Sequence, residues 1–216
     1  MARCRHFYTF TPDLHVYRFM RGQHHAGMVL SIAHASQGPD LSVAGEPLAP
    51  KRPRPTVYLD TTIPSYLTAS SADISKVRMQ RITRIWWSRL RPNCDIFVSD
   101  RVFVEARGGR EDEARKRLAA LESIDATLLS DRSDALVDSL LADGLFPVRA
   151  RVDAEHLAYA ATNAVRFLLT WNCRHLASRM IFRRVIQRCE SHGVRCPQIC
   201  TPETMMRIYA HERHTY

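Results

Sequence analysis

The sequence predicts an α/β domain in which helices cover both faces of a parallel sheet. From Thr56 onward, short runs of mainly apolar and β-favouring residues alternate with longer segments of helical pattern. Strands that alternate with helices indicate βαβ units, and such units place their strands parallel and their helices on the two faces. Each element can be assigned to a stretch of the chain.

The expected elements follow one another closely along the chain. Strands are predicted at 56–60, 95–99, 125–129, 167–171 and near 198–200. Helices are predicted at 72–90, 111–122, 131–142, 153–165 and 177–191. A short terminal helix is expected after Thr201, with Thr201 as its N-cap and Pro202 at its first position.

The N-terminal residues 1–55 differ from the rest in composition. They show no helical or strand period and end in the basic, proline-rich run Pro50-Lys51-Arg52-Pro53-Arg54-Pro55. This composition disfavours a packed core and favours extended polyproline II. We therefore predict a flexible, disordered arm at 1–55 and a folded domain at 56–216. Either the arm contacts nucleic acid or a partner, or it is not a functional element and the start lies nearer Met20 or Met28.

Composition and charge favour a polyanionic partner. The 216-residue chain has a net charge of +9 and a sequence pI near 9.6, which suits nucleic acid. Its six cysteines form no compact disulfide framework, and no secretory signal is visible at the start. No apolar run approaches the length of a membrane span. We expect a reduced, cytoplasmic protein that does not enter the membrane.

Polar residues stand at several strand ends and helix starts. Asp60 follows Val57-Tyr58-Leu59, Glu105 follows the second strand, and Asp153 opens a helix. Thr170 and Asn172 end the fourth strand segment. Ligands of open α/β sheets bind at the carboxyl ends of the strands. Carboxylates gathered there repel one another unless they hold a divalent cation, so the pattern predicts a Mg²⁺ or Mn²⁺ site and phosphodiester hydrolysis.

Each of these residues also has a purely structural interpretation. Asp60 could serve as a helix cap or turn residue, and Glu105 could be an exposed helical residue paired with Arg101. Asp153 is explained by its place at a helix start, where an acidic residue is favoured. Asp100 is expected to be an N-cap rather than a ligand.

Three further features of the sequence each allow more than one interpretation. Glu155 should point away from Asp153 and be solvated, whereas His156 lies one turn from Asp153 and is either a structural residue or part of the same cleft. Cys189, His192, Cys196 and Cys200 form an alternative zinc set, although their spacing matches none of the common zinc motifs.

Basic residues that suit contacts to phosphate stand near these positions: Arg149 and Arg151 before Asp153, and Arg174 and His175 after Asn172. The arginines of the helix at 177–191 either share that use or form a solvated basic face; they are Arg179, Arg183, Arg184 and Arg188.

Four motifs in this order resemble the PIN domain, and most closely the VapC-type toxins of bacterial toxin–antitoxin pairs. They are Val57-Tyr58-Leu59-Asp60-Thr61, Val98-Ser99 through Glu105, Val152-Asp153-Ala154 with His156-Leu157-Ala158, and Leu169-Thr170-Trp171-Asn172. The resemblance covers about 56–205. It implies a three-layer α/β/α sandwich around a mostly parallel sheet, Mg²⁺- or Mn²⁺-dependent ribonuclease activity, a homodimer and an antitoxin partner.

The same resemblance assigns roles to individual residues. Asp60, Glu105 and Asp153 take the three core acidic positions and are expected to hold the metal. Asn172 stands where many members have Asp, which puts a second metal in doubt, and Thr170 and Asn172 are expected to orient water or that second metal. The predicted function is metal-dependent endoribonucleolytic cleavage of RNA. The alternatives are a weakly active or inactive module that binds RNA or a partner protein, and a DNA nuclease.

Overall fold

The computed structural model describes residues 53–70, 73–129, 131–172 and 179–214. The predicted N-terminal arm lies outside the described residues except for its last three, Pro53 to Pro55. The predicted boundary between arm and domain therefore stays a prediction. Every strand expected from the sequence lies within the described ranges.

A single five-stranded sheet forms the centre of the described domain. The strands are β1 (Thr56–Leu59), β2 (Asp95–Ser99), β3 (Ala126–Leu129), β4 (Phe167–Leu169) and β5 (Gln198–Cys200). Their order is β3-β2-β1-β4-β5, and every neighbouring pair is parallel. Because the strands are parallel, the residues that follow each of them emerge at one edge of the sheet. The predicted parallel sheet is confirmed.

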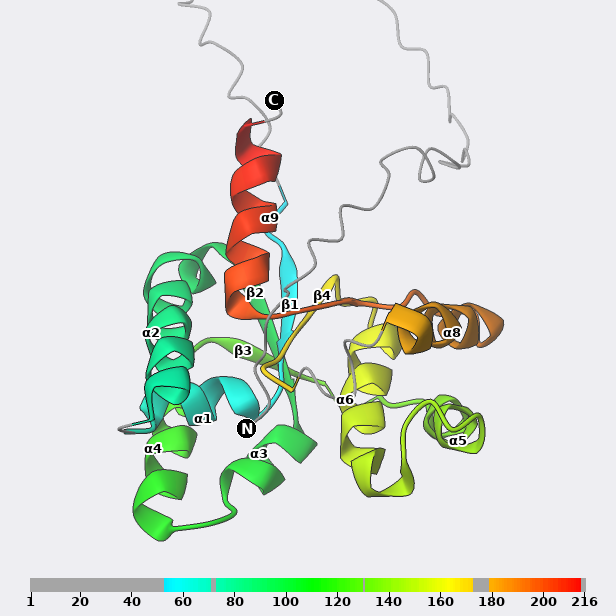
Figure 1. The fold of residues 1–216 in the computed structure, drawn as a ribbon, viewed down its shortest axis with the longest axis horizontal. Coiled ribbons are helices and arrows are strands. Elements are labelled where there is room, and N and C mark those ends of the chain that lie inside the picture. The colour runs from blue at the N-terminus through cyan, green and yellow to red at the C-terminus, as the bar shows by residue number, and fades with distance from the viewer. Residues whose placement is uncertain (1–52, 71–72, 130, 173–178, 215–216) are drawn as a thin grey trace, which may run out of the picture. The chain divides into compact units, whose positions relative to one another are not determined.

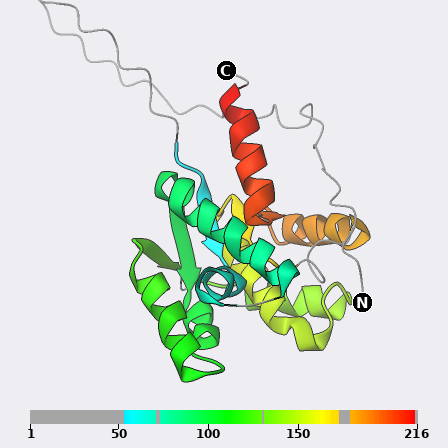
Figure 2. The same ribbon diagram turned by 60° about the vertical axis from the view of Figure 1, so that its left-hand side comes forward.

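Helices cover both faces of this sheet. They are α1 (Thr62–Thr68), α2 (Ile74–Arg89), α3 (Asp100–Ala106), α4 (Glu111–Glu122), α5 (Asp134–Ala142), α6 (Arg151–Thr162), α8 (Arg179–Ser191) and α9 (Pro202–His214), with short 3-10 turns η1 (Arg91–Asn93) and η2 (Val148–Ala150). Helices α2 and α4 lie on one side and α5, α6 and α8 on the other (Figure 1). A view turned by 60° keeps α5 and α8 together and apart from α4 (Figure 2). The predicted α/β/α sandwich is confirmed.

The core explains why the strands read as nearly continuous apolar runs. Val57, Tyr58 and Leu59 are completely buried, as expected for a central strand covered on both faces. Helix α6 is buried along most of its length, and its alanines let it pack closely against the sheet. These small side chains leave little space between the helix and β4.

Three element boundaries that concern the site differ from the predicted ones. Strands β1 and β4 end at Leu59 and Leu169, so Asp60 and Thr170 lie just beyond them. Asp60 starts a turn, because its side chain accepts a hydrogen bond from the Thr62 amide, and α1 follows directly. Helix α6 begins at Arg151, which places Asp153 inside its first turn.

Candidate active site

Asp60 lies at the centre of a buried polar cluster at the carboxyl edge of the sheet. Its Oδ1 accepts hydrogen bonds from the Thr62 amide, at 2.8 Å, and from the Thr62 hydroxyl. Its Oδ2 accepts a hydrogen bond from Thr170, which follows the neighbouring strand β4. Only 4% of Asp60 is exposed. Burial raises the pKa of Asp60, against the opposing influence of His156 and of the hydroxyl donors Thr170 and Thr62.

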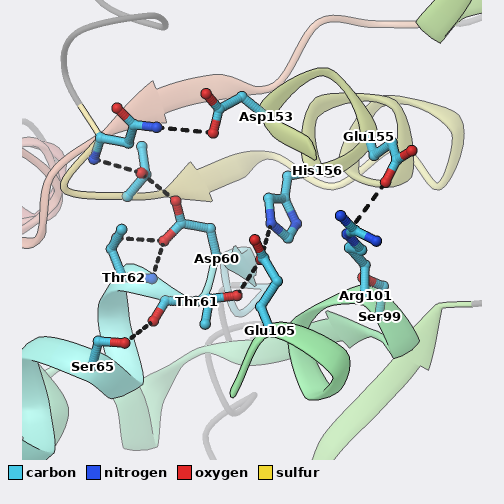
Figure 3. Close-up of polar contacts among 12 residues, drawn as sticks. Asp60, Thr61, Thr62, Ser65, Ser99, Arg101, Glu105, Asp153, Glu155 and His156 are labelled. Atoms are coloured by element: carbon cyan, nitrogen blue, oxygen red, sulfur yellow. Dashed lines mark hydrogen bonds and ion pairs between the residues drawn. The ribbon is translucent and has the colours of Figure 1, made fainter. Parts of the chain in front are cut away.

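A chain of hydrogen bonds connects Asp60 to helix α6. The backbone amide of Asn172 donates to Thr170 Oγ1 at 2.8 Å, and the side-chain amide of Asn172 donates to Asp153 Oδ1 at 2.8 Å. Four of the five predicted site residues, Asp60, Thr170, Asn172 and Asp153, therefore form one connected group. Figure 3 shows Asp153 projecting from α6 near Asp60.

Glu105, the fifth predicted residue, reaches the same region from α3. Its Oε2 accepts hydrogen bonds from the Thr61 hydroxyl at 2.6 Å and from His156 Nε2 at 2.8 Å (Figure 3). Burial raises the pKa of Glu105, but the hydrogen bonds from His156 and Thr61 outweigh it, so the pKa lies below its usual value. Glu105 therefore lies beside the Asp60 group and contacts His156, whereas Arg101 pairs with Glu155.

His156 is held from its other side by the core of the domain. Its Nδ1 lies 2.8 Å from the hydroxyl of Tyr58, which lies 2.7 Å from Ser99 Oγ. Tyr58 and Ser99 are completely buried, and 3% of His156 is exposed. Burial raises the pKa of Tyr58 far above its usual value, so the phenol stays protonated. Both interpretations of His156 thus hold: it is buried, and it contacts a site carboxylate.

The prediction that Glu155 is solvated was wrong. Only 7% of Glu155 is exposed, and its carboxylate lies 3.4–3.5 Å from three arginines, Arg101, Arg132 and Arg151. Glu155 does point away from Asp153, but α3 and the segment before α5 pack on that side of α6. Helical periodicity gives the direction of a side chain and not what packs against it.

The prediction for Asp100 was also wrong in detail. Ser99 is the residue that precedes α3, and Asp100 is the first residue of that helix. The Asp100 carboxylate accepts hydrogen bonds from the Arg101 amide at 2.8 Å and from the Tyr159 hydroxyl at 2.7 Å. Asp100 therefore joins α3 to α6 and takes no part in the carboxylate cluster.

The donor atoms of the cluster fit a hard divalent cation in kind. Carboxylate, amide and hydroxyl oxygens are the ligands that Mg²⁺ and Mn²⁺ prefer. Asp60, Glu105 and Asp153 supply the carboxylates, and Thr170 and Asn172 supply the neutral oxygens. Across the described ranges, however, no three His, Cys, Asp or Glu side chains stand close enough together to hold a metal ion. That these three carboxylates are the ligands of one cation therefore stays a proposal.

The alternative zinc set is not assembled. Cys189 and Cys200 are buried in the core, and His192 Nε2 lies 3.0 Å from Ser139 Oγ on α5. All four residues lie in the described part of the chain, and no three of them stand close enough together to hold a metal ion.

The predicted phosphate-binding arginines have different surroundings. Arg149 is exposed in the turn before α6, whereas Arg151 pairs with Asp138 and Glu155. On α8, Arg184 and Arg188 contact Asp143, so part of that basic face is used within the protein. Arg174 and His175 lie outside the described residues.

Comparisons with known proteins give structural similarities only. No family model matches the chain. No curated protein matches it in sequence either. The structure is similar to the sarcin–ricin-loop-cleaving toxin VapC20 of Mycobacterium tuberculosis, with TM-score 0.39 and 14% identity over 56% of this chain and 92% of that chain.

It is also similar to VapBC2 from Rickettsia felis bound to a DNA fragment from their promoter, with TM-score 0.42 and 15% identity over 67% of this chain and 97% of that chain. With TM-scores below 0.5, neither likeness bears on what this chain does. Among the helices of the described residues, none has the length and apolar character needed to cross a membrane.

Several residues of the cluster were not singled out from the sequence. Thr61, Thr62, Tyr58 and Ser99 all donate or accept hydrogen bonds within it. One signal was available: Tyr58 and Asp60 are two positions apart, so strand alternation puts them on one side. The spacing of Asp153 and His156 on one helix is a second signal, because residues three apart share a face.

Proposed function

We propose that the chain is a divalent-cation-dependent endoribonuclease. The observation that carries this proposal is the placement of Asp60, Glu105 and Asp153 at the same edge of a parallel sheet, where each accepts a hydrogen bond from a neutral donor. These residues come from three separate segments, and each falls on a motif that resembles the PIN domain.

Each residue has a proposed role. Asp60, Glu105 and Asp153 would hold the cation, and the chemistry it would supply is an activated water and neutralisation of charge on the phosphate. Thr170 and Asn172, which follow β4, would orient that water or a second cation. Arg149, exposed beside α6, contacts a flanking phosphate of the RNA. The net charge of +9 favours association with the polyanion.

The role as the toxin of a toxin–antitoxin pair is proposed from the resemblance of the motifs. It implies an antitoxin protein as partner and a second copy of the chain in a homodimer. Coexpression tests this role directly. The toxin proposal requires that the chain alone arrests growth and that a small protein encoded beside it restores growth.

A second function has a specific observation in its favour. The side-chain amide of Asn172 donates to Asp153, so this pair satisfies itself without a cation. A module that binds RNA or a partner protein and cleaves slowly or not at all would suit such an arrangement. It predicts RNA binding that a chelator does not change.

Cleavage of several RNAs and of single-stranded DNA over Mg²⁺ and Mn²⁺ titrations separates these functions. Asp60→Asn should lower cleavage at least about 100-fold, since an amide holds a hard cation poorly and the site loses a charge. RNA binding should survive, because phosphate contacts come from arginines. Asn172→Asp should keep or raise activity by adding a charge.

The matched control is Asp112→Asn, which makes the same change at an exposed position of α4 and should cleave like the wild type. Undiminished cleavage by Asp60→Asn would rule out the proposed site. A wild type that binds RNA but cleaves nothing at any cation concentration would favour the binding module. Cleavage of DNA in preference to RNA would favour a DNA nuclease.

A further inference from the structure

Arg101 is held in place by a buried carboxylate but keeps unused hydrogen-bond donors. Its Nε lies 3.4 Å from Glu155 Oε2, and its side chain is 35% exposed. Nε is buried and makes no hydrogen bond. In the part of the chain that the structure describes, the terminal guanidinium nitrogens of Arg101 make no hydrogen bond either. Because a guanidinium carries its N–H donors in a rigid fork, the exposed end of Arg101 is left for a ligand.

The other two arginines of this cluster each have a second carboxylate partner. Arg132 lies 2.6 Å from Asp134, and Arg151 lies 3.2 Å from Asp138. Arg101 forms a single ion pair across the described ranges, and it shares that partner with both of the other arginines. Because Arg101 has no carboxylate of its own, it is the member of the cluster best able to accept an anion.

Arg101 also lies next to a carboxylate of the candidate site. It precedes Glu105 by four residues on α3, and residues four apart share a face of a helix. Figure 3 shows Arg101 and Glu105 on the same helix, with Arg101 turned towards Glu155. Burial raises the pKa of Glu105, and the positive charge of Arg101 is one of the influences that oppose this rise. The charge of Arg101 therefore acts at the carboxyl edge of the sheet.

We propose that Arg101 binds a phosphate of the RNA strand beside the carboxyl edge of the sheet, with its guanidinium held in place by Glu155. This inference rests on the proposed function, but it requires no bound cation. The fork of a guanidinium matches the oxygens of a phosphate, and the resulting hydrogen bonds are charge-assisted. Since Glu155 is buried and already limits the rotation of Arg101, less conformational entropy is lost when the phosphate binds.

Binding of single-stranded RNA in the presence of a chelator tests this inference. The probe is a fluorescently labelled oligouridylate, because phosphate contacts carry no sequence information. Affinities of the full-length wild type, Arg101→Gln and Arg101→Lys would be measured over a range of salt concentrations. Arg101→Gln should bind about tenfold more weakly, and its plot of log affinity against log salt should be shallower by about 0.7, as for one lost phosphate contact. Arg101→Lys keeps the charge and should keep the wild-type slope.

The matched control is Arg89→Gln, which removes the same charge at an exposed position at the end of α2. Helix α2 ends shortly before β2 begins, so Arg89 lies towards the opposite edge of the sheet from the candidate site. Arg89→Gln should bind the probe within about twofold of the wild type, with the same salt slope. Urea unfolding curves would show that each variant is folded.

If Arg101→Gln does not fold, chemical modification of the wild type supplies the test. Phenylglyoxal reacts with accessible guanidinium groups, and mass spectrometry of peptides measures the reaction of each arginine separately. Oligouridylate at about ten times its dissociation constant should slow the modification of Arg101 about tenfold and leave that of Arg89 unchanged.

An Arg101→Gln variant with the affinity and salt slope of Arg89→Gln would overturn the inference. So would an Arg101→Lys variant with the shallower slope of Arg101→Gln or, where the glutamine variant is unfolded, a lack of protection of Arg101 by the probe. These results leave the proposed function intact as long as the wild type binds and cleaves RNA. A wild type that binds no RNA, with or without Mg²⁺, would overturn the proposed function itself, and this inference with it.

Discussion

At the scale of single residues, two carboxylates of one cluster have pKa values shifted in opposite directions. Burial dominates at Asp60 and raises its pKa, whereas hydrogen bonds from His156 and Thr61 dominate at Glu105 and lower its pKa. The difference comes first from burial, since Asp60 is only 4% exposed whereas the Glu105 side chain is 31% exposed, and then from the donors, since Glu105 also accepts from an imidazole. Two carboxylates at the same edge of the sheet therefore contribute to stability with opposite dependence on pH.

Asp60→Asn should make the protein more stable than the wild type at pH 7 when a chelator is present. The folded protein binds the Asp60 proton more tightly than the unfolded chain, where the pKa is near the ordinary value of 3.8. The contribution of Asp60 to stability is thus fully present below that pKa and is lost as pH rises through the raised pKa of the folded state. Urea unfolding from pH 4 to pH 7 measures this. If the difference in unfolding free energy between Asp60→Asn and the wild type were the same at pH 4 and at pH 7, the prediction would be contradicted.

Glu155→Gln should destabilise the domain by about 2 kcal/mol. Removing one partner of a buried ion pair costs roughly 3–5 kcal/mol, and we expect less here because the arginine side chains are 28–45% exposed. Urea unfolding gives the free energy. The control is Glu113→Gln: the Glu113 side chain is 47% exposed and lies 3.9 Å from Arg117, so its loss should change stability by no more than about 0.5 kcal/mol. Equal effects of the two variants would show that the arginine cluster around Glu155 adds nothing.

At the scale of elements, helix α6 combines two functions in one short segment. One face packs against the core through small residues, and the first turns carry Asp153 and His156 into the polar cluster. The position of the cluster therefore depends on how closely α6 approaches the sheet. Larger side chains on the buried face of α6 should therefore displace Asp153 and His156.

Ala158→Leu tests this close approach. Ala158 is completely buried on α6, and an overpacked core typically loses roughly 1–3 kcal/mol. Ala119→Leu makes the same change at an exposed position of α4 and should alter stability by less than about 0.5 kcal/mol. Thermal or urea unfolding distinguishes the two. A leucine at 158 that costs nothing would mean that α6 can shift without penalty.

At the scale of the whole molecule, the described domain has its own core. The buried residues form one cluster that contains members of all five strands. We therefore predict that a chain starting at Pro53 is as stable as the full chain within about 1 kcal/mol, because segments that bury little surface contribute little. Unfolding of both chains in urea measures the difference. A large loss of stability on truncation would show that residues 1–52 pack against the domain.

The sequence alone predicted all five strands, most of the helices and the edge of the sheet at which the candidate site lies, although α1 and α3 were not among the predicted helices. Strands β2 and β5 and helix α4 have the predicted bounds, since apolar periodicity and turn residues are local properties of the chain. The parallel sheet followed from the alternation of strands and helices. The grouping of Asp60, Thr170, Asn172 and Asp153 followed from their positions at strand ends and a helix start.

Only the tertiary structure determined which side chains contact one another. Asp60 and Thr170 are 110 positions apart, Tyr58 and His156 are 98 apart, and Glu105 and His156 are 51 apart. The burial of Glu155 among arginines likewise depends on which elements pack against α6. Periodicity predicts the face on which a residue lies, but the partner comes from elements distant in sequence, whose placement depends on the packing of the whole core.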